Sequence, residues 1–207
     1  MIAVQPGYSD REFLAVLQSG VRHYRGEPKE PSHTVVGSVE WCERFLDPKP
    51  VPDYYPMWAR DFMYRHTWRS ERWQIGKIVF IKPADRYKRF TGFVTKDWGC
   101  TGKQRGPYMV STPVKFTQEW RYYVAAGEVL TAGWYDGTDE DEPAPTIEMF
   151  PEHVYGAVDT GRLSTGDLAL VEYQHPYACG WYGDSSDHKK YVDWLIAGWA
   201  WLKEGNR

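Results

Sequence analysis

The feature that most constrains the fold is an uninterrupted apolar run that ends in a lysine and a proline. Residues 78–81 read Ile-Val-Phe-Ile and are followed by Lys82 and Pro83. Four apolar residues in a row predict a short strand that is buried on both of its faces. A lysine at the end of such a strand is costly to bury without a partner. We therefore expect an anion beside Lys82; the alternative is a lysine that extends its charge into the solvent.

The composition describes a globular chain without a strong electrostatic bias. Its 207 residues are enough for one substantial core and at most two small lobes. The net charge of -3 gives no electrostatic reason to bind nucleic acid or an anionic membrane. Aromatic residues make up 16% of the chain, which favours an aromatic-rich core. The alternative is an exposed aromatic surface that binds sugar or nucleic acid.

Cysteine and histidine spacing argues against a disulfide framework and against a zinc enzyme. The cysteines, Cys42, Cys100 and Cys179, lie far apart, and the six histidines show no H-E-x-x-H spacing. No apolar stretch approaches the ~18 residues of a membrane span. The first seven residues lack the basic and hydrophobic regions of a signal peptide. We therefore expect a protein of the reducing cytoplasm.

Patterns along the chain predict strands in runs, with helices mainly at the two ends. A capping box at 9–12 begins a first helix, Ser38 caps a second, and Asp187 caps a last one. We interpret 22–32 as loop and 57–74 as short helix and loop. The predicted strands are 34–37, 77–82, 91–96, 107–111, 115–126, 128–135, 153–159 and 167–173, with a turn at 160–161. This order predicts an α+β fold.

Side chains alternate between the two faces of the predicted strand 115–126. Glu119 and Arg121 therefore share one face, while Trp120 lies on the other. One interpretation is a Glu119–Arg121 ion pair on a solvent-exposed face. The other is that Arg121 grips a phosphate group, because a guanidinium group donates two parallel hydrogen bonds.

Two carboxylates lie on the last pair of predicted strands. If these strands form a hairpin, Asp159 and Glu172 converge near one end, with Leu170 and Gln174 on the same face as Glu172. Two carboxylates and an amide oxygen suit Mg²⁺; ordinary polar strand ends are the alternative. Carboxylates gathered without a cation repel one another, so we expect Asp159→Asn to leave the protein at least as stable.

No familiar nucleophile or phosphate-loop motif occurs in the sequence. G-x-S-x-G is absent, and residues 99–103 lack the spacing of a P-loop. We interpret 99–103 as a flexible loop, one that could fold over phosphates. Cys100 lies in this loop, but a nucleophilic cysteine needs a base that the sequence does not identify.

Taken in order, these residues resemble a known family. The matching positions are Gly37-Ser38-Val39-Glu40, Tyr55-Pro56, Arg60, Phe80-Ile81-Lys82-Pro83, Lys88, Phe90, Gly92, Ser111-Thr112-Pro113-Val114, Glu119-Trp120-Arg121, Asp159, Leu170-Val171-Glu172 and Gly180-Trp181-Tyr182-Gly183. The series resembles ATP-grasp proteins, more narrowly the divergent clade named for two arginines and one lysine. That clade includes a eukaryotic assembly factor for a translation initiation factor and many bacterial and phage proteins. The resemblance covers roughly residues 35–183.

The resemblance implies two lobes of mainly antiparallel sheet with flanking helices and ATP between them. It assigns the nucleotide contacts to Lys82 and Arg121, to the weaker candidates Arg60 and Lys88, to Glu119, and to the adenine hinge at Met109, Val110, Ser111 and Thr112. Mg²⁺ would be held by Asp159 and Glu172, with Gln174 in place of the usual asparagine. Residues 1–56 would form a pre-ATP-grasp-like segment and residues 57–207 one compact ATP-grasp region.

The function that the resemblance implies is ATP-dependent ligation that forms ADP. ATP would phosphorylate a carboxylate, and an amine or related nucleophile would then displace phosphate from the acylphosphate. The substrates could include a peptide or protein, whereas membrane and nucleic acid are not expected partners. A phage-encoded member would act in the host cytoplasm. The alternative is an assembly factor or chaperone that binds ATP and Mg²⁺ without catalysis.

Overall fold

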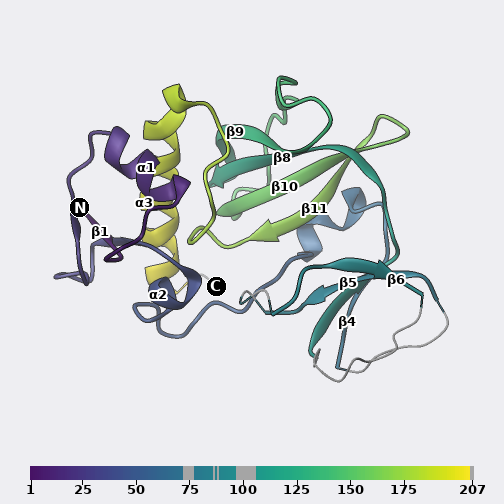
Figure 1. Cartoon of the computed structure of the whole chain (residues 1–207), viewed down its shortest axis with the longest axis horizontal. Helices are drawn as coiled ribbons and strands as arrows, with labels where there is room; N and C mark the ends of the chain where they lie inside the picture. Colours follow the sequence, from purple (N-terminus) through teal and green to yellow (C-terminus); the bar gives the residue numbers. More distant parts are fainter. Residues whose placement is uncertain (72–76, 86, 88, 97–105, 206–207) are drawn as a thin grey trace.

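Three β-sheets and one long helix organise the molecule. The structure, a computed structural model, describes residues 1–71, 77–85, 87, 89–96 and 106–205. Two of the sheets are antiparallel and have four strands each, and the third is a parallel sheet of three short strands. Figure 1 shows the three α-helices beside the N-terminal sheet, away from the small antiparallel sheet. The predicted α+β class, with two lobes of mainly antiparallel sheet, is confirmed.

The large antiparallel sheet has the strand order β11-β10-β8-β9. Its strands are β8 (Phe116–Ala125), β9 (Glu128–Gly137), β10 (Gly156–Leu163) and β11 (Leu168–Gln174). Alternation along β8 places Trp120 in one core cluster and Tyr123 in another, on the opposite face of the sheet. The predicted turn at 160–161 is wrong, because β10 continues through those residues and pairs with both of its neighbours.

The small antiparallel sheet has the order β4-β7-β5-β6. Its strands are β4 (Thr67–Ser70), β5 (Val79–Pro83), β6 (Phe93–Thr95) and β7 (Tyr108–Ser111). Val79 and Ile81 are buried, whereas Phe80 and Lys82 lie half-buried on the other face. The prediction that this strand is buried on both faces is therefore wrong, because one face lines a cavity. Strand β4 also lies in residues 57–74, for which only short helix and loop were predicted.

The N-terminal sheet has the parallel order β2-β1-β3. Its strands are β1 (Ile2–Val4), β2 (His23–Arg25) and β3 (Thr34–Val36), and only the last of them was predicted. Helix α1 (Arg11–Gln18) follows β1, with Asp10 at its N-cap. Helix α2 (Val39–Glu43) begins after Ser38, whose hydroxyl accepts from the backbone N–H of Trp41 at 3.2 Å, as predicted. Two 3₁₀ helices, η1 (Met57–Phe62) and η2 (Ser185–Asp187), complete the short elements.

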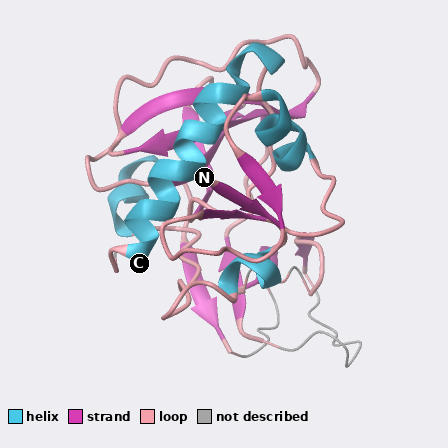
Figure 2. Cartoon of the chain, turned by 90° about the vertical axis from the view of Figure 1, so that its left-hand side faces the viewer, coloured by secondary structure: helices cyan, strands magenta, loops and turns pink. Residues whose placement is uncertain are grey.

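Helix α3 (His188–Lys203) joins the N-terminal sheet to the large sheet. Its Trp194 belongs to one buried cluster with Ile2 of β1 and Tyr123 of β8. The Trp194 indole N–H lies 3.0 Å from the carbonyl oxygen of Val124 and 3.2 Å from that of Gly156. Figure 2 shows this helix running diagonally along the side of the molecule. The predicted boundary between residues 1–56 and 57–207 remains a proposal. The core cluster that contains Ile2, Tyr123 and Trp194 includes residues from both sides of it.

The aromatic-rich core is confirmed by the burial of the largest side chains. Trp120, Trp194, Tyr122 and Tyr123 are at most 1% exposed. Among the described residues, no tryptophan is exposed. No helix in the described part of the chain is long and apolar enough to cross a bilayer.

The close approach of α3 to the chain before it makes Gly198 a testable position. A Cβ at residue 198 would lie 2.2 Å from the Cβ of Pro176, so Gly198→Ala should overpack the contact. We expect a loss of about 1–3 kcal/mol in the free energy of unfolding, larger than the ~1 kcal/mol that alanine gains in helix propensity. Urea unfolding measures the difference. Ala200→Gly, at an exposed position of the same helix, is the matched control, and a Gly198→Ala variant as stable as the parent would contradict the contact.

Candidate functional site

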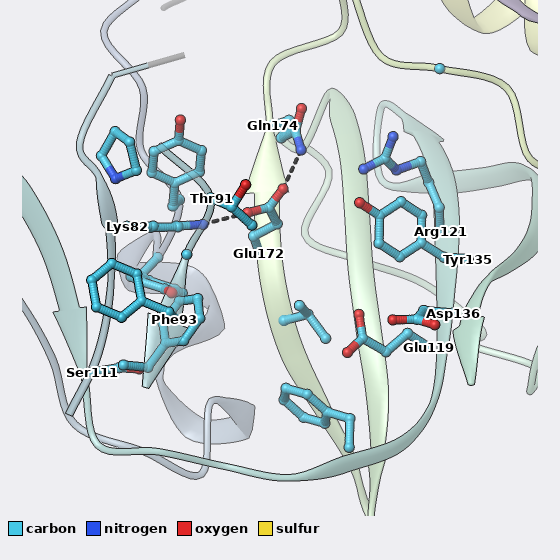
Figure 3. Close-up of a pocket in the computed structure, with 18 of the residues that line it drawn as sticks. Lys82, Thr91, Phe93, Ser111, Glu119, Arg121, Tyr135, Asp136, Glu172 and Gln174 are labelled. Atoms are coloured by element: carbon cyan, nitrogen blue, oxygen red, sulfur yellow. Dashed lines mark hydrogen bonds and ion pairs between the residues drawn. The ribbon is translucent and has the colours of Figure 1, made fainter. Parts of the chain in front are cut away.

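A cavity of about 1020 Å³ separates the two antiparallel sheets and extends to the N-terminal segment. The small sheet contributes Lys82 and Ser111 to its wall, and the large sheet contributes Glu119, Arg121 and Glu172. Figure 3 shows these side chains converging from the two sheets. The structure thus brings together residues that are up to 90 positions apart in the sequence.

Lys82 crosses the cavity to form an ion pair with Glu172 of the opposite sheet. Their side chains are 12% and 20% exposed, and the Lys82 ammonium lies 3.8 Å from the centre of the Tyr54 ring. Burial opposes protonation of Lys82, but the Glu172 carboxylate outweighs it, so the pKa of Lys82 is raised. Burial also opposes ionisation of Glu172, yet Lys82 and Arg121 lower the pKa of Glu172 to about 2. Both groups therefore carry their charges at neutral pH.

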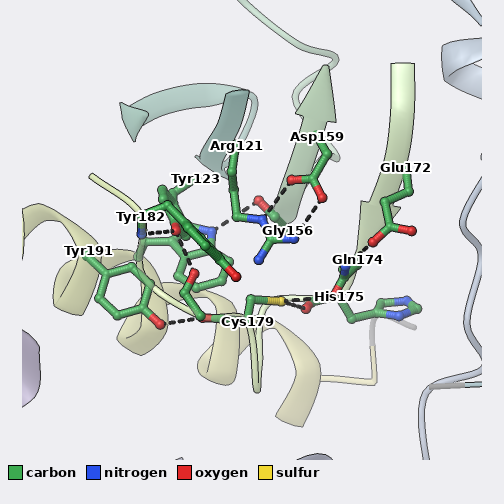
Figure 4. Close-up of polar contacts among 12 residues, drawn as sticks. Arg121, Tyr123, Gly156, Asp159, Glu172, Gln174, His175, Cys179, Tyr182 and Tyr191 are labelled. Atoms are coloured by element: carbon green, nitrogen blue, oxygen red, sulfur yellow. Dashed lines mark hydrogen bonds and ion pairs between the residues drawn. The ribbon is translucent and has the colours of Figure 1, made fainter. Parts of the chain in front are cut away.

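Arg121 is held by Asp159 of the neighbouring strand rather than by Glu119. The Arg121 Nε and one terminal nitrogen donate to the two Asp159 oxygens, each at 2.7 Å (Figure 4). The two side chains are only 4% and 1% exposed. Burial works against the charge on Arg121, but Asp159 outweighs it and keeps the pKa of Arg121 well above its ordinary value. The alternative interpretation from the sequence, an ion pair between Glu119 and Arg121, is therefore wrong.

A β-bulge places the two carboxylates directly opposite each other. Asp159 pairs with Glu172 and Thr160 pairs with Leu170, so Val171 is the extra residue. Directly opposite residues on neighbouring strands have Cβ atoms about 4.5–5.5 Å apart. Glu172 lines the cavity, while Asp159 lies behind the wall, against Arg121. The bulge also corrects the prediction that Leu170 shares a face with Glu172, because Leu170 is in the core.

Gln174 lines the cavity beside Glu172 and is hydrogen-bonded through both ends of its amide. Its nitrogen donates to Glu172 Oε1, and its oxygen accepts from the Cys179 thiol at 3.6 Å. A half-turn of the amide would point the oxygen toward Glu172. No group of three or more His, Cys, Asp or Glu side chains that could hold a metal occurs within the described ranges. The side chains here that could bind a metal ion are the carboxylates of Asp159 and Glu172 and the amide of Gln174.

A second pair of acids, Glu119 and Asp136, lies further along the same wall. They are opposite each other on β8 and β9, and both line the cavity. Burial, together with the nearby Asp159 and Asp136 carboxylates, raises the pKa of Glu119 to about 7. Unlike Glu172, Glu119 has no cation paired with it in the described part of the chain. Glu119 is therefore only partly ionised at neutral pH, and this part of the wall is acidic.

Several residues that the sequence singled out lie away from the wall. Arg60 is exposed on η1 and does not line the cavity. Met109 and Val110 belong to β7, whose backbone pairs with β4 and β5. The Thr112 N–H donates to the backbone carbonyl oxygen of His66 at 3.0 Å. The cavity wall instead continues from Ser111 through residues 114–116. Lys88, Cys100 and the loop 99–103 lie outside the described residues.

The aromatic and basic groups that surround the two ion pairs were not predicted from the sequence. Tyr54 and Tyr55 both lie beneath the Lys82 ammonium, and Tyr135 lies 4.7 Å from the Arg121 guanidinium. Arg65 donates to the Val171 carbonyl at 2.5 Å and stacks on Tyr55. The Tyr-Tyr-Pro run at 54–56 was the only local signal, because these contacts join distant parts of the chain.

The raised pKa of Glu119 predicts a pH-dependent stability. Between pH values of about 5 and 7 the folded protein keeps a proton that the unfolded chain has lost, so stability falls as pH rises through this window. The effect is at most about 3 kcal/mol. Glu119→Gln should remove it, and Asp136→Asn should reduce it by lowering the pKa of Glu119. Urea unfolding at several pH values measures the slope. Glu128→Gln, at the exposed start of β9, is the control, and an unchanged slope in Glu119→Gln would contradict the assignment.

The sequence of residues 57–193 matches a known family, described as an ATP-grasp domain of family 2 in the clade named for two arginines and one lysine. Among solved structures, the chain is similar to the ATP-grasp ligase PsnB complexed with minimal precursor, with 12% identity, a TM-score of 0.48, and 95% of this chain and 99% of that chain covered. It is also similar to N5-carboxyaminoimidazole ribonucleotide synthetase from Thermotoga maritima, with 10% identity, a TM-score of 0.43, and 95% and 75% covered. No curated protein matches the chain in sequence. At these TM-scores the assignment rests on the family match, which spans more than half of the chain, and the protein therefore belongs to the ATP-grasp superfamily, in family 2 of that clade.

Proposed function

We propose that the protein is an ATP-dependent ligase that joins a carboxylate to an amine through an acylphosphate and releases ADP. The observation that carries this proposal is the position of Lys82 and Arg121. They come from facing sheets, both line the same cavity, and each is held in place by a carboxylate. Two fixed cations on opposite walls suit a triphosphate, and family membership supports the same ligand.

In this proposal ATP lies across the cavity between the two sheets. Lys82 and Arg121 contact its phosphates, and Lys88 remains a further candidate. Ser111 and residues 114–116, which line the cavity, face the base, since the backbone of Met109 and Val110 is already paired inside the sheet. Glu119 accepts hydrogen bonds from the nucleotide at the acidic part of the wall. We leave Arg60 out of the site because it is exposed on η1, outside the cavity.

The residues around Glu172 fit a hard divalent cation such as Mg²⁺. Asp159 and Glu172 are directly opposite each other, and both are neutralised by cationic side chains in this structure. Mg²⁺ prefers carboxylate and amide oxygens together with phosphate oxygens and water. We propose that Glu172 holds the ion together with Asp159, which keeps its bidentate contact with Arg121 and offers one of its remaining lone pairs, and that Gln174 becomes a third ligand once its amide oxygen turns away from Cys179. When bound, the ion would neutralise charge on the phosphates.

The reaction needs positioning and charge neutralisation rather than a protein nucleophile. An oxygen of the donor carboxylate attacks the γ-phosphorus, the bond to the β–γ bridging oxygen breaks, and ADP leaves. The amine nitrogen then attacks the acyl carbon, phosphate leaves, and the amine proton passes to solvent. Lys82 and Arg121 hold the phosphates in line and balance the charge that develops on them.

We propose a peptide or protein as one of the two substrates. The rival function is that of an assembly factor that binds ATP and Mg²⁺ without catalysis. The two differ in their products, because only a ligase forms ADP in a manner that depends on both a carboxylate and an amine. Binding of ATP without such ADP formation would favour the assembly factor.

Nucleotide binding should depend on Lys82. Losing one hydrogen bond to a charged group costs about 1.5–3 kcal/mol, so Lys82→Met should weaken ATP·Mg²⁺ binding roughly 10- to 100-fold. Titration calorimetry measures the affinity. Because Lys82→Met leaves Glu172 half-buried and unpaired, the double variant Lys82→Met/Glu172→Leu guards against a failure to fold, and it is compared with Glu172→Leu because that change alone removes a proposed metal ligand. Lys189→Met, which removes a lysine of the exposed Lys189–Asp193 pair on α3, is the control, and parental affinity in both Lys82 variants would exclude a phosphate contact.

The metal proposal predicts different behaviour for its two carboxylates. Glu172→Gln should raise the Mg²⁺ concentration needed for half-maximal ATP binding roughly tenfold or more. Asp159→Asn should also weaken metal-dependent binding. It should in addition destabilise the protein by about 3–5 kcal/mol, because Arg121 loses its buried partner. This differs from the expectation, based on repulsion between carboxylates, that Asp159→Asn would leave the protein at least as stable, because Asp159 is paired with Arg121. Calorimetry over a Mg²⁺ series and urea unfolding test the two effects, and a Glu172→Gln variant with parental Mg²⁺ dependence would rule out Glu172 as a ligand.

A further inference from the structure

The cavity continues beyond the Arg121–Asp159 pair to the N-terminal segment. There its wall is formed by Tyr8 and Arg11, next to and at the start of α1, and by Gly180 and Tyr182 after β11. None of these residues belongs to the two antiparallel sheets that face each other across the proposed nucleotide. This end of the cavity therefore has room for a second molecule beside the phosphates.

The Tyr182 ring lies close to two guanidinium groups. The Arg121 guanidinium carbon is 5.1 Å from the ring centre, and that of Arg11 is 5.3 Å from it. The charge on Arg121 is balanced by the bidentate contact with Asp159. Within the described ranges no carboxylate forms an ion pair with Arg11. Arg11 is therefore available to an anion that enters the cavity.

The acidic neighbours of Arg11 are directed to other partners. Asp10 caps α1, where its carboxylate accepts from the backbone N–H of Arg11 at 2.7 Å. Glu12 is 1% exposed and accepts from the Tyr8 hydroxyl at 2.9 Å. The Arg11 side chain itself is exposed at the cavity wall. Its position allows a planar, bidentate contact with a carboxylate.

The platform beneath Arg11 is fixed by contacts to the large sheet. The Tyr123 hydroxyl donates to the Gly180 carbonyl at 2.7 Å and accepts from the Tyr182 N–H at 3.1 Å (Figure 4). A Cβ at Gly133 of β9 would lie 2.2 Å from the Tyr182 carbonyl oxygen, so only glycine permits this approach. The Tyr182 ring also packs on Tyr135, with 4.8 Å between the ring centres. Arg11 therefore stacks on a ring whose place is set by β8 and β9.

We propose that Arg11, stacked on Tyr182, binds the carboxylate of the acyl donor and presents it to the phosphates that Arg121 holds. This inference rests on the proposed ligase function and adds the donor subsite to it. One donor oxygen attacks the γ-phosphorus, and ADP leaves as described above. Arg11 pairs with the carboxylate before the attack, and it neither gives nor takes a proton because its guanidinium group stays charged. The donor is accordingly a small molecule or peptide with a free carboxylate that enters from the α1 side.

The test separates donor binding from nucleotide binding. The full chain is incubated with ATP, Mg²⁺ and hydroxylamine, which traps an acylphosphate as a hydroxamate. The donors are the free amino acids, their N-acetyl forms, dipeptides and tripeptides, and mono- and dicarboxylic acids of two to six carbons. Arg11→Gln should raise the KM for the donor roughly 10- to 100-fold, while the affinity for ATP measured by calorimetry stays at the parental value. Arg11→Lys should recover only part of the loss, because a lysine cannot make the bidentate contact.

Arg44→Gln is the matched control. Arg44 also stacks on aromatic rings in the N-terminal part of the chain, at 4.8 Å from the Trp41 ring centre, but it does not line the cavity. Its removal should leave both the donor KM and the ATP affinity unchanged. Tyr182→Leu, which removes the stacking platform, should raise the donor KM as Arg11→Gln does. Parental donor KM in Arg11→Gln overturns the inference. A parent protein that fails to bind ATP, or that binds ATP but forms hydroxamate from none of these donors, overturns the proposed function on which the inference rests.

Discussion

The ion pair between Arg121 and Asp159 is the interaction on which the site depends. It joins the two central strands of the large sheet, and its bidentate geometry fixes a guanidinium group that would otherwise have several rotamers. Removing either partner leaves the other side chain charged, unpaired and only 1–4% exposed, which is far more costly than losing a surface ion pair. Arg121 can therefore remain on the cavity wall as a fixed cation only because Asp159 lies behind it.

The second ion pair has a different character because it crosses the cavity. Lys82 and Glu172 come from different sheets and are partly exposed, so their contact can open without breaking a strand pairing. In the proposed complex each of these groups exchanges its partner, Lys82 for a phosphate and Glu172 for a metal ion. Charge balance is kept only if the anion and the cation bind together. Binding of ATP alone or of Mg²⁺ alone would leave one half-buried charge uncompensated.

The sequence was informative where local patterns decide the structure. Alternation along β8 separates Arg121 from Trp120, and Ser38 caps α2, so both could be predicted. The strands β1 and β2 were not predicted, because His23–Arg25 has no run of β-branched residues such as Thr34–Val36 has, and Ile2–Val4 becomes a strand only by pairing with these two distant segments. The partner of Arg121 was equally out of reach. Two strands that are 38 residues apart in sequence must pair before Asp159 lies opposite it, and Glu119 looked like the nearer choice.

The bulge at Val171 shows how one residue decides which groups reach the site. A strict period of two would place Leu170 and Glu172 on the same face, and one of them would then be misplaced. The extra residue puts Leu170 in the core and Glu172 on the cavity wall. Arg65 donates to the carbonyl oxygen of this residue and so supports the bulge from outside the sheet. The contact joins the chain before β4 to the strand that carries Glu172, which makes the position of a proposed metal ligand depend on the connection between the two lobes.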